Sequence, residues 1–229
     1  FRPVEAQRGY LREETIAGIV HDLKVPLSTI GLELGELGTR LGASEAAAEA
    51  LARVELNVMF MDRMIHDLLD AASIDDGHFA MHFHTTELRS LLSEVVGRVV
   101  STRDRARVKV NASETILASI DDNRIERVLA NLVANAIRYS PADSEIDVRL
   151  ERAGAMARVS VTDFGPGLTA DEATYVFDKY RRAATAARHD GVGLGLYVCR
   201  KIVEQHGGRI GVETAPRRGS RFYFEIPLL

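Results

Sequence analysis

Residues 16–41 read IAGIVHDLKVPLSTIGLELGELGTRL, and apolar side chains return in this stretch at alternating intervals of four and three residues. This seam consists of Ile16, Val20, Leu23, Leu27, Ile30, Leu34, Leu37 and Leu41. A second seam with the same spacing consists of Ala47, Leu51, Val54, Val58, Met61, Ile65, Leu68 and Ala72. Heptad spacing is typical of helices in coiled coils and bundles. We therefore expect two long helices over residues 16–72.

The segment between the two predicted helices is short, with Gly42 as a helix stop and Ser44 as a helix cap. A short link makes the helices antiparallel neighbours. A lone hairpin with one apolar seam per helix buries its apolar surface poorly, whereas a second copy would complete a four-helix bundle. We therefore expect a homodimer. The alternative is a hairpin that packs on the rest of its own chain.

Beyond the turn residues 74–77 the periodicity changes. Strand-like alternation or short apolar runs occur at 78–85, 108–110, 116–120, 146–150, 157–162, 209–214 and 220–227, and helical periodicity at 87–100, 121–140 and 194–206. This order predicts an α+β sandwich of one helical layer and one mixed, largely antiparallel sheet. The predicted fold class is thus two domains, an all-α antiparallel helical hairpin over residues 1–76 and an α+β sandwich over residues 77–229.

The composition limits the classes of function. Of the 229 residues, 46% are hydrophobic, and 29 basic against 33 acidic side chains leave a formal net charge of −4. This balance offers no basic surface for nucleic acid or an anionic membrane. No run approaches the ~18 apolar residues of a membrane span, and the single cysteine, Cys199, favours a reducing, cytoplasmic location. Because the chain starts at Phe1, we expect a fragment of a longer protein, whether or not that protein is anchored in a membrane.

The first candidate for chemistry is His21, which begins the stretch HDLKVPL. The heptad frame places His21 beside the seam, so its imidazole should reach solvent and be neutral and nucleophilic near pH 7. Lys24 shares that face and can hold an incoming anion, while Pro26 should kink the helix. Taken alone, a surface histidine beside an acid is more often an ordinary solvated residue.

A second group of polar side chains lies on the predicted helix 121–140. Asn131 and Asn135 are four residues apart, so their amides project from one face, with Arg138 one turn further on. Two carboxamides and a guanidinium in this order can hold a hydrated Mg²⁺ and phosphate oxygens. Without context, the simpler interpretation is the wet face of an amphipathic helix.

Two glycine-rich turns complete the set. Asp163-Phe-Gly-Pro-Gly167 ends a predicted strand, where the carboxylate can accept a hydrogen bond from an amine such as adenine N6. Gly191-Val-Gly-Leu-Gly195 opens a predicted helix, whose backbone N–H groups favour phosphate. The basic segment 180–190 before it is interpreted as a lid over polyphosphate. Each turn alone is equally typical of an ordinary loop.

In this order the motifs resemble the catalytic core of bacterial sensor histidine kinases of two-component signalling. The similar boxes are the phosphoacceptor box at 21–27, the asparagine box at 131–141, the first glycine box at 163–167, the phenylalanine box at 175–182, the second glycine box at 191–196 and the final glycine turn at 219–222. The resemblance spans the chain from Thr15 to its C-terminus.

The resemblance implies that ATP binds the sandwich with Mg²⁺ and that its γ-phosphoryl passes first to Nε2 of His21, then to an aspartate of a response-regulator receiver domain. The implied catalytic residues are His21, Asp22 as general base, Lys24 and Arg182, which would stabilise the transferring charge. Asn135 would be the principal Mg²⁺ ligand, Asp163 would bind adenine and Tyr139 would flank the base or ribose. The residues expected around the nucleotide are Asn131, Asn135, Arg138, Tyr139, Asp163, Gly165, Gly167, Tyr180, Gly191, Gly193, Leu194, Gly195, Leu196 and Ser220.

Two departures from related patterns refine the expectation. Family members that also dephosphorylate their regulator usually have Thr or Asn where Val25 stands, so we expect weak phosphatase activity. In the wider superfamily with gyrase and mismatch-repair ATPases, a glutamate that activates water stands at the position of Asn131, and an amide cannot act as that base. Two alternatives remain open: a nucleotide-binding signalling scaffold without kinase activity, and a gyrase-like ATP hydrolase.

Overall fold

The computed structural model describes residues 64–74, 79–181 and 193–229, together with Ile30, Val54, Val58 and Met61. The chain divides into two compact units, Phe1–Phe79 and Ala80–Leu229. In the first unit, residues 64–74 are helical, and the buried Ile65 packs against Val58, Leu68 and Leu69. Of these residues, Val58, Ile65 and Leu68 belong to the second predicted seam. The first predicted seam lies outside the described residues, except for Ile30.

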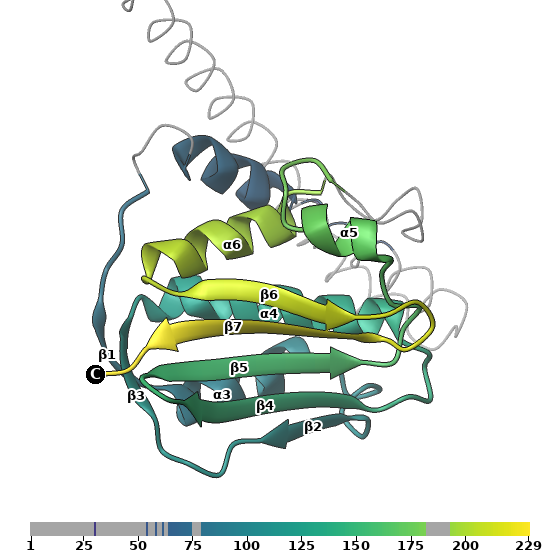
Figure 1. Cartoon of the computed structure of the whole chain (residues 1–229), viewed down its shortest axis with the longest axis horizontal. Coiled ribbons are helices and arrows are strands. Elements are labelled where there is room, and N and C mark those ends of the chain that lie inside the picture. The colour runs from purple at the N-terminus through teal and green to yellow at the C-terminus, as the bar shows by residue number, and fades with distance from the viewer. Residues whose placement is uncertain are drawn as a thin grey trace, which may run out of the picture. The chain divides into compact units, whose positions relative to one another are not determined.

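The second unit is built on a five-stranded sheet in the order β2-β4-β5-β7-β6 (Figure 1). The strands are β2 (Val108–Asn111), β4 (Ile146–Ala153), β5 (Met156–Asp163), β6 (Arg209–Thr214) and β7 (Ser220–Pro227). β2 pairs with β4 in parallel, and every other neighbouring pair is antiparallel. A separate antiparallel pair joins β1 (His84–Glu87) to β3 (Leu117–Ile120). The mixed, largely antiparallel sheet is as predicted.

A layer of helices covers one face of this sheet (Figure 1). It consists of α3 (Leu88–Val99), α4 (Asp122–Tyr139) and α6 (Gly195–Gln205), with the short α5 (Ala170–Tyr175) near β6. Alternate residues of the central strands, such as Val159 and Val161 of β5, are buried in the core with the apolar face of α4. The α+β sandwich predicted from the periodicity is therefore confirmed.

His206, the C-cap of α6, ties the C-terminal end of α6 to the N-terminal end of α4. Its Nδ1 lies 2.7 Å from the carbonyl oxygen of Ile202, and its Nε2 accepts the backbone N–H of Asp121 at 3.0 Å. Asp121 is the N-cap of α4 and also accepts the backbone N–H of His82. Burial lowers the pKa of the His206 imidazole, in keeping with a neutral ring that donates through one nitrogen and accepts through the other.

The other face of the sheet carries a buried carboxylate. Arg158, Glu225 and Arg209 are directly paired across β5, β7 and β6. Glu225 is 1% exposed and accepts hydrogen bonds from both guanidinium groups. The hydrogen bond from Arg209, with a further contribution from Arg158, lowers the pKa of the Glu225 carboxyl against its burial.

Two elements differ from the sequence prediction. Within the strand expected at 78–85, the described residues 79–83 are not in a strand and β1 begins at His84, because the His82 amide bonds to the Asp121 side chain instead of to a partner strand. Helix α5 was not predicted. It is six residues long and is held by a capping box, in which Thr169 and Glu172 each bond the other's backbone N–H.

Candidate functional site

Helix α4 positions the paired asparagines. Asn135 Nδ2 donates to Asn131 Oδ1 at 2.9 Å, so the two amides lie side by side on one face as the i, i+4 spacing predicts. The first residue of α6, Gly195, packs against the same amide, because a Cβ atom at position 195 would lie only 2.5 Å from Asn131 Nδ2. The start of α6 therefore approaches the middle of α4 as closely as a residue without a side chain allows.

The Asp163–Gly167 turn, which follows β5, lies at the C-terminal end of α4. A Cβ atom on Gly165 would lie 2.7 Å from the backbone oxygen of Tyr139, the last residue of α4. Asp163 is 6% exposed, and its carboxylate accepts the Gly165 N–H at 2.8 Å. Burial raises the pKa of the Asp163 carboxyl, and hydrogen bonds from the backbone N–H groups of Gly165 and Ser220 oppose that shift.

The two contacts along α4 set the length of the site. Asn131 and Tyr139 are eight residues apart, which is about 12 Å at the helical rise of 1.5 Å per residue. One end is formed by amides and a helix N-terminus, which suit phosphates and a cation. The other end carries a buried carboxylate and a tyrosine, which suit the polar edge and the face of a base. This arrangement fits a nucleotide that lies along the helix.

The N-terminus of α6 has no side-chain cap. Its N-cap is Leu194, whose side chain bears no hydrogen-bonding group, and Gly193 before it adopts a φ of +76°. The Tyr180 N–H donates to the Gly193 oxygen at 3.0 Å, so Tyr180 and Gly193 lie side by side although they are 13 positions apart in the sequence. Tyr180 is 57% exposed, with the Lys179 ammonium 5.3 Å from its ring centroid.

The phenylalanine box anchors this region to the core. Phe177 is buried in a cluster with Leu168 and Val176, against which Leu196 of α6 packs. Its ring meets that of Phe222 edge to face at a centroid distance of 6.2 Å. Leu194 is also buried. The Leu194 side chain therefore belongs to the core, so Leu194 can meet a ligand only through its backbone, whereas Leu196 is half-buried.

The remaining predicted residues have varied surroundings. The Arg138 guanidinium lies 5.9 Å from the Tyr139 ring centroid. Ser220 is buried, and its hydroxyl bonds to that of Thr214 at 2.9 Å. Gly219 is not among the predicted site residues, although a Cβ there would lie 2.0 Å from the backbone oxygen of Asp163. Its signal was the turn Gly-Ser-Arg-Phe that begins with it. The predicted residues outside the described ones are His21, Asp22, Lys24, Arg182 and Gly191.

The described residues also fit a magnesium ion that is bound together with a nucleotide. Among them there is no group of three His, Cys, Asp or Glu side chains that could hold a metal. With the NH₂ of Asn135 engaged by Asn131, the Asn135 amide oxygen is the atom that suits the ion. Mg²⁺ commonly takes its other ligands from phosphates and water.

Family profiles match both units of the chain. The profile of the His kinase A (phosphoacceptor) domain matches residues 11–77, and that of the histidine kinase-, DNA gyrase B- and HSP90-like ATPases matches residues 120–229. The chain belongs to the sensor histidine kinases. Its second unit is the ATP-binding domain of such a kinase, and its fold class is the one predicted from the sequence.

Three relatives illustrate the similarity. The adaptive-response sensory kinase SasA of Synechocystis sp. is 30% identical over 97% of this chain. The match covers 61% of the length of SasA. The catalytic domain of histidine kinase ThkA is 31% identical over 65% of the chain and 97% of that domain, with a TM-score of 0.55. Full-length ShkA in complex with AMPPNP has a TM-score of 0.69 at 22% identity, over 94% of this chain and 46% of that one.

In the kinase, no helix among the described residues is long and apolar enough to cross a membrane.

Proposed function

We propose that this catalytic core transfers the γ-phosphoryl group of ATP to His21 and then to an aspartate in the receiver domain of a response regulator. In the first step, Nε2 of His21 bonds to the γ-phosphorus, the bond to the β–γ bridging oxygen breaks, and ADP leaves. Asp22 accepts the Nδ1 proton of the imidazole. In the second step, the P–N bond breaks as a carboxylate oxygen of the regulator bonds to phosphorus, and Asp22 returns the proton to Nδ1, so His21 leaves as neutral imidazole. Asn135 would hold Mg²⁺ together with the nucleotide phosphates, and Arg182 would stabilise the transferring charge.

The observation that carries this proposal is the meeting of three segments along α4. Gly195 packs against Asn131, Gly165 packs against Tyr139, and Asp163 bonds to Gly165. These contacts place groups suited to a base at the Tyr139 end of α4 and groups suited to phosphates at its Asn131 end. A histidine phosphoacceptor domain in the same chain provides the group that receives the phosphoryl.

We further propose that the first unit forms a homodimer and that the core acts in the cytoplasm. Residues 1–76 would form the dimerisation and phosphotransfer hairpin, and residues 77–229 the catalytic domain. Support for the dimer comes from apolar residues of the two predicted seams that are exposed to solvent. Ile30, Val54 and Met61 are 42%, 42% and 46% exposed. Exposed apolar side chains at heptad spacing are typical of a seam that a second helical pair covers.

The experiment that tests the kinase reaction is incubation of the chain with γ-labelled ATP and Mg²⁺, followed by assay of acid-labile, base-stable label. We expect label in the wild type and none in His21→Gln. The matched control is His84→Gln, which removes an exposed histidine paired to Asp122 at 3.0 Å in the ATP-binding domain and should keep the label. Nucleotide binding without label would instead favour the scaffold, and free phosphate without label would favour the hydrolase.

A further inference from the structure

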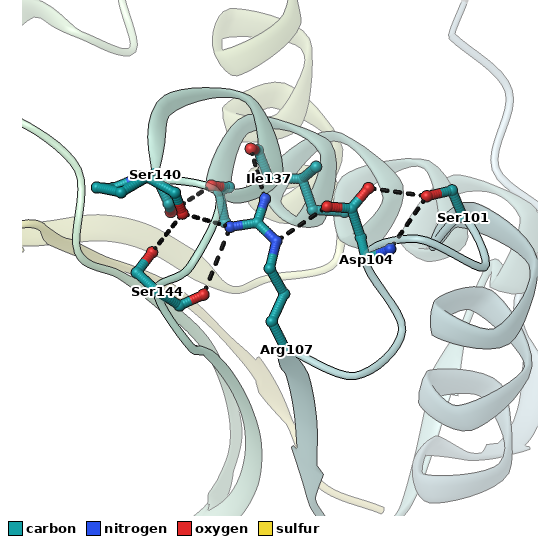
Figure 2. A network of polar contacts seen from close by, with 8 residues as sticks. Ser101, Asp104, Arg107, Ile137, Ser140 and Ser144 are labelled. Atoms are coloured by element: carbon teal, nitrogen blue, oxygen red, sulfur yellow. Dashed lines mark hydrogen bonds and ion pairs between the residues drawn. The ribbon is translucent and has the colours of Figure 1, made fainter.

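Arg107 holds the C-terminal end of α4 through backbone carbonyls (Figure 2). Its Nη2 donates to the Ile137 oxygen at 2.9 Å, and its Nη1 donates to the Pro141 oxygen at 2.8 Å. The same Nη1 lies 3.4 Å from the Ser144 oxygen. The Arg107 side chain is only 11% exposed, and its hydrogen bond to Ile137 is part-buried, while the one to Pro141 lies at the surface.

The guanidinium is itself held in place from the other side. Its Nε donates to Asp104 Oδ1 at 2.9 Å, and Asp104 Oδ2 accepts the Ser101 hydroxyl at 2.8 Å. Figure 2 shows this chain of contacts running from Ser101 through Asp104 to the fork of Arg107. The fork is therefore fixed before it reaches α4, and a fixed planar donor sets the position of the carbonyls that it bonds.

A cation is well suited to this place. The last carbonyls of a helix have no partner within the helix and carry the negative end of its dipole. Ile137 is in the last turn of α4, and Pro141 lies two residues beyond its end. By bridging the two, Arg107 joins the helix end to the loop that follows.

The segment that Arg107 holds is one wall of the proposed nucleotide site. It contains Tyr139, whose backbone oxygen lies against Gly165 of the first glycine box. The segment is thus held both by the guanidinium and by its contact with the turn that carries Asp163. Without the hydrogen bonds from Arg107, the end of α4 can shift and change the space between Tyr139 and that turn.

We propose that Arg107 is a positioning residue for nucleotide binding, which sets the distance between Tyr139 and the Asp163–Gly167 turn and so the fit of the base end of the nucleotide. The proposal rests on the function proposed above. It assigns Arg107 to binding and not to phosphoryl transfer, because Asn131 and Gly195 meet at the other end of the site, two turns along α4.

The test compares Arg107→Met and Arg107→Lys with the wild-type chain for KM and kcat of autophosphorylation at varied ATP. Met keeps the aliphatic stem but donates no hydrogen bond, so KM should rise about tenfold while kcat changes less than about twofold. Lys keeps the charge without the fork and should fall between the two. The control is Arg98→Met, which removes an exposed ion pair between α3 and α4 (2.7 Å to Glu126) and should leave KM unchanged.

The outcomes separate this proposal from the kinase function. If the wild-type chain binds no ATP in titration calorimetry, the proposed function itself fails. If the wild type binds and a folded Arg107→Met variant keeps the wild-type KM, or loses kcat alone, the positioning role is wrong. If Arg107→Met does not fold, Arg107→Lys carries the test, and a wild-type KM in that variant overturns the proposal.

Discussion

Replacement of Gly195 by alanine should abolish most of the activity without weakening the fold. The new Cβ would lie 2.5 Å from Asn131 Nδ2, where an ordinary contact needs about 3.5 Å. The Asn131 amide must therefore move by about 1 Å, which breaks its hydrogen bond to Asn135. A displacement of about 1 Å in a positioned group can cost about a hundredfold in rate, so we expect autophosphorylation to slow by about that factor.

The cost to stability should be small for two reasons. The side chain that must move is the end of Asn131, not backbone, and its lost hydrogen bond contributes about 1 kcal/mol. Alanine offsets part of this loss, although Gly195 is the first residue of α6 and the gain of roughly 0.5–1 kcal/mol over glycine applies in full only inside a helix. The free energy of unfolding should therefore change by less than about 1 kcal/mol.

The assay measures the initial rate of autophosphorylation beside urea denaturation of the same preparations. Gly97→Ala is the matched control, since Gly97 lies in α3 with nothing within 4 Å of an added Cβ. It should gain roughly 0.5–1 kcal/mol of stability and keep the wild-type rate. A Gly195→Ala variant that keeps the wild-type rate, or that loses several kcal/mol of stability, would refute the reasoning.

Acid should weaken the fold through His206, because burial lowers the pKa of its imidazole and the unfolded chain then binds the proton more tightly. This stability is complete above about pH 6.5 and is lost as the pH falls through the lowered pKa, so the urea midpoint should drop more in wild type than in His206→Gln. Glu225→Gln should lower the free energy of unfolding by about 2 kcal/mol in urea titrations, because it leaves Arg158 and Arg209 without their shared counter-ion. Glu213→Gln, at an exposed pair with Arg221, should change it by less than about 0.5 kcal/mol. Val25→Thr should speed loss of label from the phosphorylated regulator and leave autophosphorylation unchanged, since the added hydroxyl can orient the attacking water.

Elements that satisfy their own local requirements could be predicted from the sequence. Helix α4 has an N-cap in Asp121 and buried residues at helical spacing, and it was predicted within one residue at each end. Helix α5 was missed because six residues are too few to show a period. Its capping box, Thr169 with Glu172, was the available signal. The start of β1 was wrong because a side chain 39 positions away, Asp121, takes the amide of His82.

In the candidate site, too, features with a local sequence pattern could be predicted, and contacts between distant residues could not. Motifs predicted the asparagines and the glycine turns, because amide and glycine residues are rare enough in such patterns to be informative. They did not predict that Gly195 touches Asn131, 64 positions earlier. Arg107 left no signal at all, since its partners on α4 and the following loop are backbone carbonyls. Every residue has a carbonyl, and so the sequence around Ile137 and Pro141 carries no trace of the contact.

The glycines of the site differ in whether an added side chain would meet backbone or a side chain. A Cβ on Gly167 or Gly219 would lie 2.0 Å from a backbone oxygen, and both have positive φ, so a side chain there must disturb the fold itself. At Gly165 the nearest atom is also backbone, the Tyr139 oxygen at 2.7 Å. At Gly195 the three nearest atoms all belong to the Asn131 side chain. Substitution at Gly195 therefore falls on a group of the proposed site that can turn away, which is why activity and stability should separate there and not at Gly167 or Gly219.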